Sequence, residues 1–82
     1  MVQIIWDEPK RQANLEKHGL DFADLDKDFF ESAVVVTARS GRRMAIGWFG
    51  GLGIVVIHVV YGVEAISVIS MRPASAAERK VI

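Results

Sequence analysis

The chain has 82 residues, of which 51% are hydrophobic, and it has no cysteine. This length suits one domain (residues 1–82) with a modest core, and the apolar content argues against a disordered chain. The lack of cysteine excludes disulfides, a thiolate metal site and a cysteine nucleophile. It is also compatible with a reducing cytoplasm, where we expect the protein to reside.

The formal net charge is zero, whereas nucleic-acid-binding domains are usually basic. The charges are, however, unevenly distributed. Residues 21–31 contain five acidic residues and one lysine, so this segment carries a charge of −4 and the rest of the chain carries +4. A basic, phosphate-facing side outside this segment is therefore compatible with the composition.

The N-terminal part predicts one strand and two helices. Residues 2–6 have the pattern of a short strand. Asp7 then favours an N-cap, and the helix that we expect over about residues 9–18 ends at Gly19, because glycine tolerates the left-handed conformation of a helix end. A second helix is expected over about residues 22–30, where aromatic and leucine side chains form an apolar stripe.

The C-terminal part predicts a sheet. Strands are expected over residues 33–38, 43–49, 53–61 and 64–71. Gly50 and Gly51 favour a tight hairpin, and Ser75 and Glu78 have the spacing of a capping box, which predicts a short C-terminal helix. Because short turns join these strands, we expect an α+β fold, namely an antiparallel meander with two N-terminal helices and a short C-terminal helix packed on one face.

Residues 44–63 contain no charged side chain, and twenty such residues could span a membrane. Five of them are glycines, and the most apolar stretch, residues 54–57, is β-branched, which suits strands better than helices. We therefore interpret this segment as two strands joined by a glycine turn and expect no membrane association. A membrane span is the weaker alternative.

Three blocks of residues resemble one known family. They are Trp6-Asp7, Lys10, Asn14, Lys17-His18-Gly19 and Phe22 at the start, Arg43-Met44-Ala45-Ile46-Gly47 in the middle, and Ile69-Ser70-Met71-Arg72-Pro73-Ala74 with Glu78-Arg79 at the end. Their order and spacing are similar to those of the BrnT toxins over nearly the whole chain.

This resemblance implies a RelE-like fold and metal-independent cleavage of RNA, a ribonuclease activity that inhibits growth. It also implies a cognate antitoxin of the ribbon-helix-helix class, similar to BrnA, which neutralises the toxin. Operator DNA would be contacted only through that antitoxin. The implied partners are thus an RNA substrate and a protein, and no cofactor is expected.

Metal-free RNA cleavage needs a base for the ribose 2′-OH, a cation for the phosphorane and an acid for the leaving oxygen. Arg72 is the first candidate for the cation, because a guanidinium matches phosphate oxygens and stays charged, and Arg79 could add a second contact. A surface arginine paired with an acid is the alternative interpretation of Arg72. For Arg79 the alternative is a solvated helix charge.

Lys17 and His18 are the candidates for proton transfer, although capping of the helix end beside Gly19 would also explain them. Arg43 is the candidate for a further RNA phosphate contact. His58 is interpreted as a core histidine rather than a catalytic one. With two histidines and no HxxxH or HxxE spacing, no metal site is expected.

Ser67 stands where relatives often carry an arginine. This departure motivates a second hypothesis, in which the protein is a cleavage-poor toxin homologue that binds its antitoxin and acts as a transcriptional co-regulator. Growth arrest on expression that is relieved by Arg72→Ala would favour the enzyme over this binding role.

Overall fold

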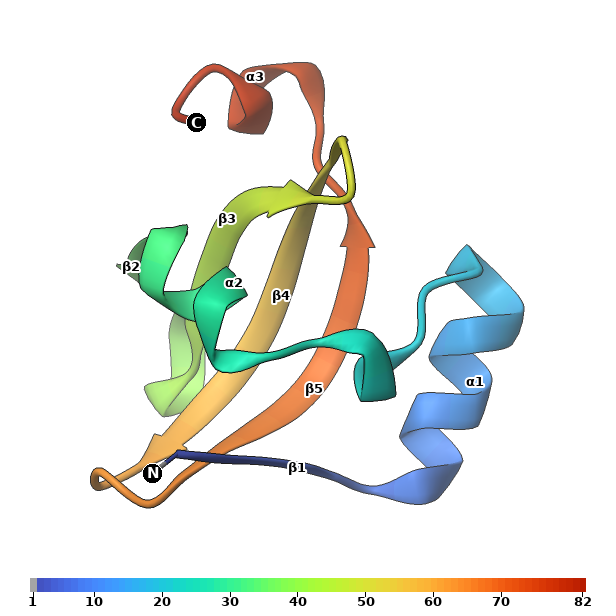
Figure 1. Cartoon of the computed structure of the whole chain (residues 1–82), viewed down its shortest axis with the longest axis vertical. Helices are drawn as coiled ribbons and strands as arrows, with labels where there is room; N and C mark the ends of the chain where they lie inside the picture. Colours follow the sequence, from blue (N-terminus) through green and yellow to red (C-terminus); the bar gives the residue numbers. More distant parts are fainter. Residues whose placement is uncertain (1) are drawn as a thin grey trace.

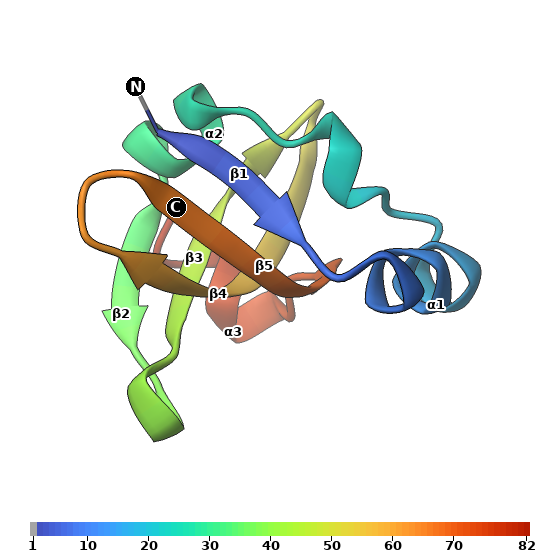
Figure 2. The same ribbon diagram turned by 90° about the horizontal axis from the view of Figure 1, so that it is seen from below.

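The computed structural model describes residues 2–82. Its elements in chain order are β1 (Gln3–Trp6), α1 (Glu8–His18), the 3-10 turn η1 (Phe22–Asp24), α2 (Lys27–Ser32), β2 (Val34–Thr37), the 3-10 turn η2 (Arg39–Gly41), β3 (Arg43–Phe49), β4 (Leu52–Tyr61), β5 (Ala65–Pro73) and α3 (Ala76–Arg79). The five strands form one curved sheet, with α1 beside the β5 edge in both views (Figures 1 and 2).

The sheet is mixed, so the predicted antiparallel meander is wrong for the sheet as a whole. The strand order is β1-β5-β4-β3-β2, and only β2 to β5 pair in antiparallel fashion. β1 instead pairs in parallel with β5, where Gln3 lies opposite Ala65 and Trp6 opposite Val68. The meander rule joins strands that follow each other in sequence, and it could not foresee that the first strand pairs with the last.

The prediction of two N-terminal helices is also wrong. Instead of one helix over about residues 22–30, the chain makes the turn η1 and then the six-residue α2. Leu25 between them is extended, with φ −76° and ψ 144°. Asp21 accepts a hydrogen bond from the Ala23 N–H, and Asp26 accepts one from the Phe29 N–H, so each aspartate caps its own short element.

Apolar side chains cover both faces of the sheet, so the prediction of helices on one face only is wrong as well. On the first face, Phe22 and Phe29 pack against Val56 and Met71. On the opposite face, a smaller cluster of Ile46, Val55 and Ala74 is joined by Ile82 from the C-terminal segment, and α3 lies beside it. The short C-terminal segment thus protects the face that α1 and α2 leave uncovered.

The uncharged segment forms the β3–β4 hairpin, as the glycine pattern predicts. Phe49 lies opposite Leu52, and Gly50 and Gly51 between them have φ of 57° and 84°, which are the positive values that a two-residue type I′ turn requires. None of the helices within residues 2–82 is long and apolar enough to cross a membrane.

Two groups of contacts fix α1 in place. At its start, Arg11 bridges Glu8 and Asp21, with Nη2 to Oε2 at 2.6 Å and Nη1 to Oδ2 at 3.0 Å. The Trp6 indole also donates to Glu8, and these bonds lower the pKa of Glu8 to about 2. In its middle, Asn14 is bound to β5, as described below.

Candidate active site

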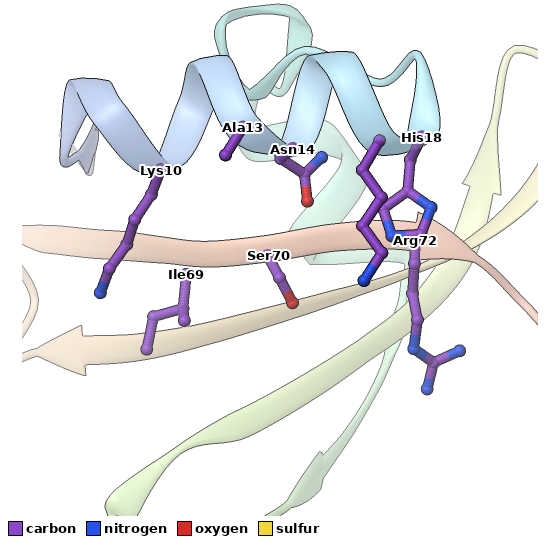
Figure 3. Close-up of a pocket in the computed structure, with 8 residues that line it drawn as sticks. Lys10, Ala13, Asn14, His18, Ile69, Ser70 and Arg72 are labelled. Atoms are coloured by element: carbon purple, nitrogen blue, oxygen red, sulfur yellow. The ribbon is translucent and has the colours of Figure 1, made fainter.

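A groove of about 420 Å³ runs between α1 and β5. It is lined by Lys10, Ala13, Asn14, Lys17 and His18 from the helix and by Ile69, Ser70 and Arg72 from the strand. Figure 3 shows Lys10, Asn14 and His18 pointing from α1 toward β5, with Arg72 extending from the strand near the His18 end. Three of the five predicted site residues therefore lie in one groove, namely Lys17, His18 and Arg72.

Asn14 builds the floor of this groove. β1 covers the edge of β5 only as far as Val68, so the edge beyond it needs other hydrogen-bond partners. The buried Asn14 amide supplies them, because Nδ2 donates to the Met71 carbonyl at 2.9 Å and Oδ1 accepts from the Met71 N–H at 3.0 Å. A third bond joins Nδ2 to the Leu20 carbonyl at 3.1 Å. The Asn14 side chain thus makes the hydrogen bonds that the backbone of a neighbouring strand would otherwise make to Met71.

Lys17 and His18 end α1 and also face the groove. Gly19 follows in the left-handed conformation, with φ 69°, and its N–H donates to the Leu15 carbonyl at 2.8 Å. The backbone of Gly19 therefore caps the helix as predicted, and the two basic side chains remain available to the groove. The C-terminal end of a helix favours cations, so both interpretations of these residues are compatible with their position.

Arg72 lies at the end of β5 and forms an ion pair with Glu78. Nη1 lies 2.8 Å from Oε1 and Nη2 lies 2.9 Å from Oε2, so the two groups meet as a bidentate pair. This pairing and the Ser75 backbone hydrogen bond lower the pKa of Glu78 to about 2, and the pairing raises the pKa of Arg72. The Arg72 side chain is nevertheless 37% exposed. It is thus both paired with an acid and accessible from the groove.

The other two predicted residues lie outside the groove. Arg79 lies on α3, where Nη1 donates to the Ala74 carbonyl at 2.9 Å. Arg43 is exposed at the start of β3, with β4 between it and β5. Ser67 lies on β5 opposite Val59 and does not line the groove.

From the sequence, no chemical role was predicted for Lys10 or Asn14, and Glu78 was noted only in the capping box and in the blocks that resemble the BrnT family. The helical signal for the first two was present, because Lys10, Asn14 and Lys17 are spaced by four and three residues and so share one helix face. No sequence pattern indicated that Glu78 pairs with Arg72. The capping box is confirmed, but Arg72 lies six residues away on a different element.

His58 is a core residue, as the sequence interpretation holds. It is 2% exposed, its Nδ1 lies 3.1 Å from the Val56 carbonyl, and its ring meets Phe30 edge to face. Burial lowers the pKa of His58, because the charged ring would lose its hydration, although the Val56 hydrogen bond acts in the opposite direction. A neutral, hydrogen-bonded imidazole is therefore expected at neutral pH.

The model of the ribonuclease toxin BrnT of type II toxin–antitoxin systems matches residues 6–78, most of the chain. The chain belongs to the BrnT family. The matched region contains all eight groove residues and ends at Glu78. A crystal structure of the Brucella abortus ribonuclease toxin BrnT is also similar, at 59% identity and a TM-score of 0.86, with 92% of this chain and 99% of that chain covered. A search of curated proteins gives no significant match.

Membership in the BrnT family makes this protein a ribonuclease toxin of a type II toxin–antitoxin system, and such a toxin has an antitoxin partner. The resemblance seen in the sequence is thus confirmed. No group of three or more His, Asp or Glu side chains within residues 2–82 is placed to hold a metal ion.

Proposed function

We propose that the groove between α1 and β5 cleaves RNA without a metal ion, by attack of a ribose 2′-OH on the adjacent phosphate. The observation that supports this proposal is the arrangement of Lys17, His18 and Arg72, which come from two elements and line one groove. In the proposed step, the 2′-oxygen bonds to phosphorus and the bond from phosphorus to the 5′-oxygen breaks. The products are a 2′,3′-cyclic phosphate and a free 5′-OH.

Arg72 stabilises the charge that develops on the phosphorane, because its guanidinium remains charged and can donate two parallel hydrogen bonds to phosphate oxygens. One of Lys17 and His18 takes the proton of the 2′-OH, and the other returns a proton to the 5′-oxygen. Histidine suits either role, since its ordinary pKa lies near neutrality.

Arg79 and Arg43 lie outside the groove, so in this proposal they contact only flanking parts of the RNA. Arg79 is close in sequence to Arg72, and its side chain crosses Gly53 at the end of the β3–β4 hairpin. Arg43 would extend the phosphate contacts across the sheet. Neither residue is assigned to the bond-breaking step.

We further propose that the antitoxin is a ribbon-helix-helix protein and that it alone contacts operator DNA. The sequence resemblance supports the antitoxin class, and the zero net charge of the toxin gives no support to direct DNA binding. Mobility-shift assays with the antitoxin alone, the toxin alone and the complex test this division of roles. A shift by the toxin alone would contradict it.

The test of the enzymatic proposal is incubation of antitoxin-free protein with labelled RNA in excess EDTA. Wild type is expected to cleave and Arg72→Ala is not, whereas Arg39→Ala, which removes an exposed arginine outside the groove, retains cleavage. A cyclic phosphate at the new 3′ end identifies the 2′-OH as the nucleophile. Intact RNA in all tubes, also with ribosomes added, would contradict the proposal and favour a role limited to antitoxin binding.

A further inference from the structure

We propose that Glu78 is a positioning residue, which holds the end of the Arg72 guanidinium so that Arg72 binds the scissile phosphate side-on, through Nε–H and the second N–H of Nη2. This inference rests on the proposed function of the groove. It adds a residue from α3 to a site whose lining comes from α1 and β5.

The hydrogen bonds of Arg72 define which of its edges is free. A guanidinium has five N–H donors. Nη1 uses its two on Glu78 Oε1 and, at 3.3 Å, on the Pro73 carbonyl, and Nη2 uses one on Glu78 Oε2. The two donors without a partner in residues 2–82 are Nε–H and the second N–H of Nη2. They are neighbours on one edge, with the fork geometry that matches two phosphate oxygens.

Glu78 is itself fixed, which is what a positioning residue needs. Its Oε1 accepts a hydrogen bond from the Ser75 N–H at 2.8 Å, while its own N–H donates to Ser75 Oγ at 3.1 Å. This capping box ties the carboxylate to the first turn of α3. Glu78 is also the less exposed partner, at 20% against 37% for Arg72. The carboxylate that the cap holds therefore orients the more exposed guanidinium.

The alternative is that Glu78 competes with the phosphate for Arg72 and lowers activity. The geometry argues against competition, because the carboxylate occupies the end of the guanidinium and leaves the side edge free. A bound phosphate can therefore meet Arg72 without displacing Glu78. A purely structural ion pair is the other alternative, and it would leave the turnover of the folded enzyme unchanged.

The variants Glu78→Ala and Glu78→Gln separate these cases. The alanine removes both bonds to Arg72, and we expect kcat to fall by about 10- to 100-fold with a smaller change in KM, since misplacement by about 1 Å has this effect. The glutamine keeps a single acceptor oxygen and should lie between alanine and wild type. The matched control is Glu31→Ala, which removes an exposed carboxylate that does not line the groove. It should retain the wild-type kcat.

Two further measurements keep the proposal falsifiable. In an Arg72→Ala background, Glu78→Ala should not lower the affinity for a DNA oligonucleotide any further, because the carboxylate acts only through the arginine. Nitrogen-15 NMR of the arginine side chains, with a short DNA oligonucleotide that lacks 2′-hydroxyls, should shift the Arg72 Nε–H signal in wild type, and much less in Glu78→Ala. Circular dichroism confirms that each variant is folded.

The outcomes are distinct. Wild-type kcat in folded Glu78→Ala, while Arg72→Ala is inactive, would overturn the positioning role but leave the proposed function intact. A higher kcat in Glu78→Ala would overturn it in favour of competition. If wild type does not cleave RNA, the proposed function fails. The NMR titration then tests the side-on contact by itself, and an unshifted Arg72 Nε–H signal would overturn that contact.

Discussion

Asn14 holds α1 against β5 and also lines the groove. Its amide satisfies both backbone groups of Met71, the residue directly before Arg72, and it is 8% exposed. Asn14→Ala would leave these groups without protein partners, and each unpaired buried group costs about 1–3 kcal/mol. We expect the free energy of unfolding to fall by about 2 kcal/mol in urea denaturation, with a loss of cleavage because α1 and β5 no longer hold the groove together.

The matched control for this substitution is Glu16→Ala, which changes an exposed position on the same helix. Such surface changes usually remain within about 0.5 kcal/mol of wild type. Equal stability of the two variants would show that water replaces the Asn14 amide, and the strand-like role described above would then be wrong.

His58 predicts how stability depends on pH. Its folded pKa lies below the usual 6.5, mainly through burial, with a smaller effect of Arg43. The unfolded chain therefore binds more protons near pH 6, so the contribution of His58 is complete above pH 6.5 and is lost as the pH falls through that value. Urea denaturation between about pH 7.5 and about pH 5.5 should show this decrease in wild type.

A substitution at His58 assigns the effect. His58→Gln should lower overall stability but flatten its pH dependence. Glu8 and Glu78 do not interfere. Their pKa values of about 2 lie below the usual 4.5, so their contributions are lost only as the pH falls below 4.5. A slope that persists in His58→Gln would contradict this assignment.

At the level of single residues, motif residues whose side chains suit proton transfer or phosphate binding could be proposed from the sequence. Lys17, His18 and Arg72 stand in recognisable blocks, and the structure brings them to one groove. The roles of Asn14 and Glu78 could not be predicted, because each depends on a partner in another element. Met71 is 57 residues from Asn14, and no local pattern encodes that contact.

At the level of elements, patterns with a local cause were predicted and contacts between distant elements were not. The positive φ values of Gly50 and Gly51 and the Ser75–Glu78 capping box follow from local chemistry, and β3 begins and ends where expected. The second helix was wrong because Asp26 offered the backbone a better cap than a continuous helix. The parallel pairing of β1 depends on α1, η1 and α2 bringing the chain back across the sheet.

Gly47 on β3 and Gly53 on β4 allow a test of how closely α2 packs against the sheet. A Cβ on Gly47 would lie 3.0 Å from Phe29 Cε1 and 3.2 Å from Ala33 Cβ, so α2 would have to move away from β3. We expect Gly47→Ala to lower the free energy of unfolding by about 1–3 kcal/mol, as overpacking of a core does. Thermal or urea denaturation measures this loss.

Gly53→Ala is the matched control on the opposite face. Its Cβ would lie 3.0 Å from Arg79 Cγ, so the exposed Arg79 side chain would have to shift by a few tenths of an ångström. We expect a change within about 1 kcal/mol, since an alanine in a strand also restricts the unfolded chain. Equal losses at the two positions would show that α2 is not held against β3 by close packing.

At the level of the whole molecule, the zero net charge hides a local concentration of cations. Five of the ten acidic residues lie in segment 21–31, whereas Lys10, Lys17 and Arg72 line the groove. With no net charge to attract RNA over long distances, binding should depend on these three groups at short range. Each phosphate contact to a single strand releases counterions and adds about 0.7 to the slope of log affinity against log salt.

Three contacts thus predict a slope of about −2 for wild type with a DNA oligonucleotide that is short enough to fill only the groove and cannot be cleaved through a 2′-OH. Lys10→Ala should reduce its magnitude by about 0.7, because Lys10 lines the far end of the groove from Arg72. Lys80→Ala removes the same formal charge from an exposed position outside the groove and should leave the slope unchanged. Fluorescence anisotropy over a salt series measures both slopes. Equal effects of the two lysines would mean that total charge governs binding, and the groove between α1 and β5 would then not be the RNA-binding surface.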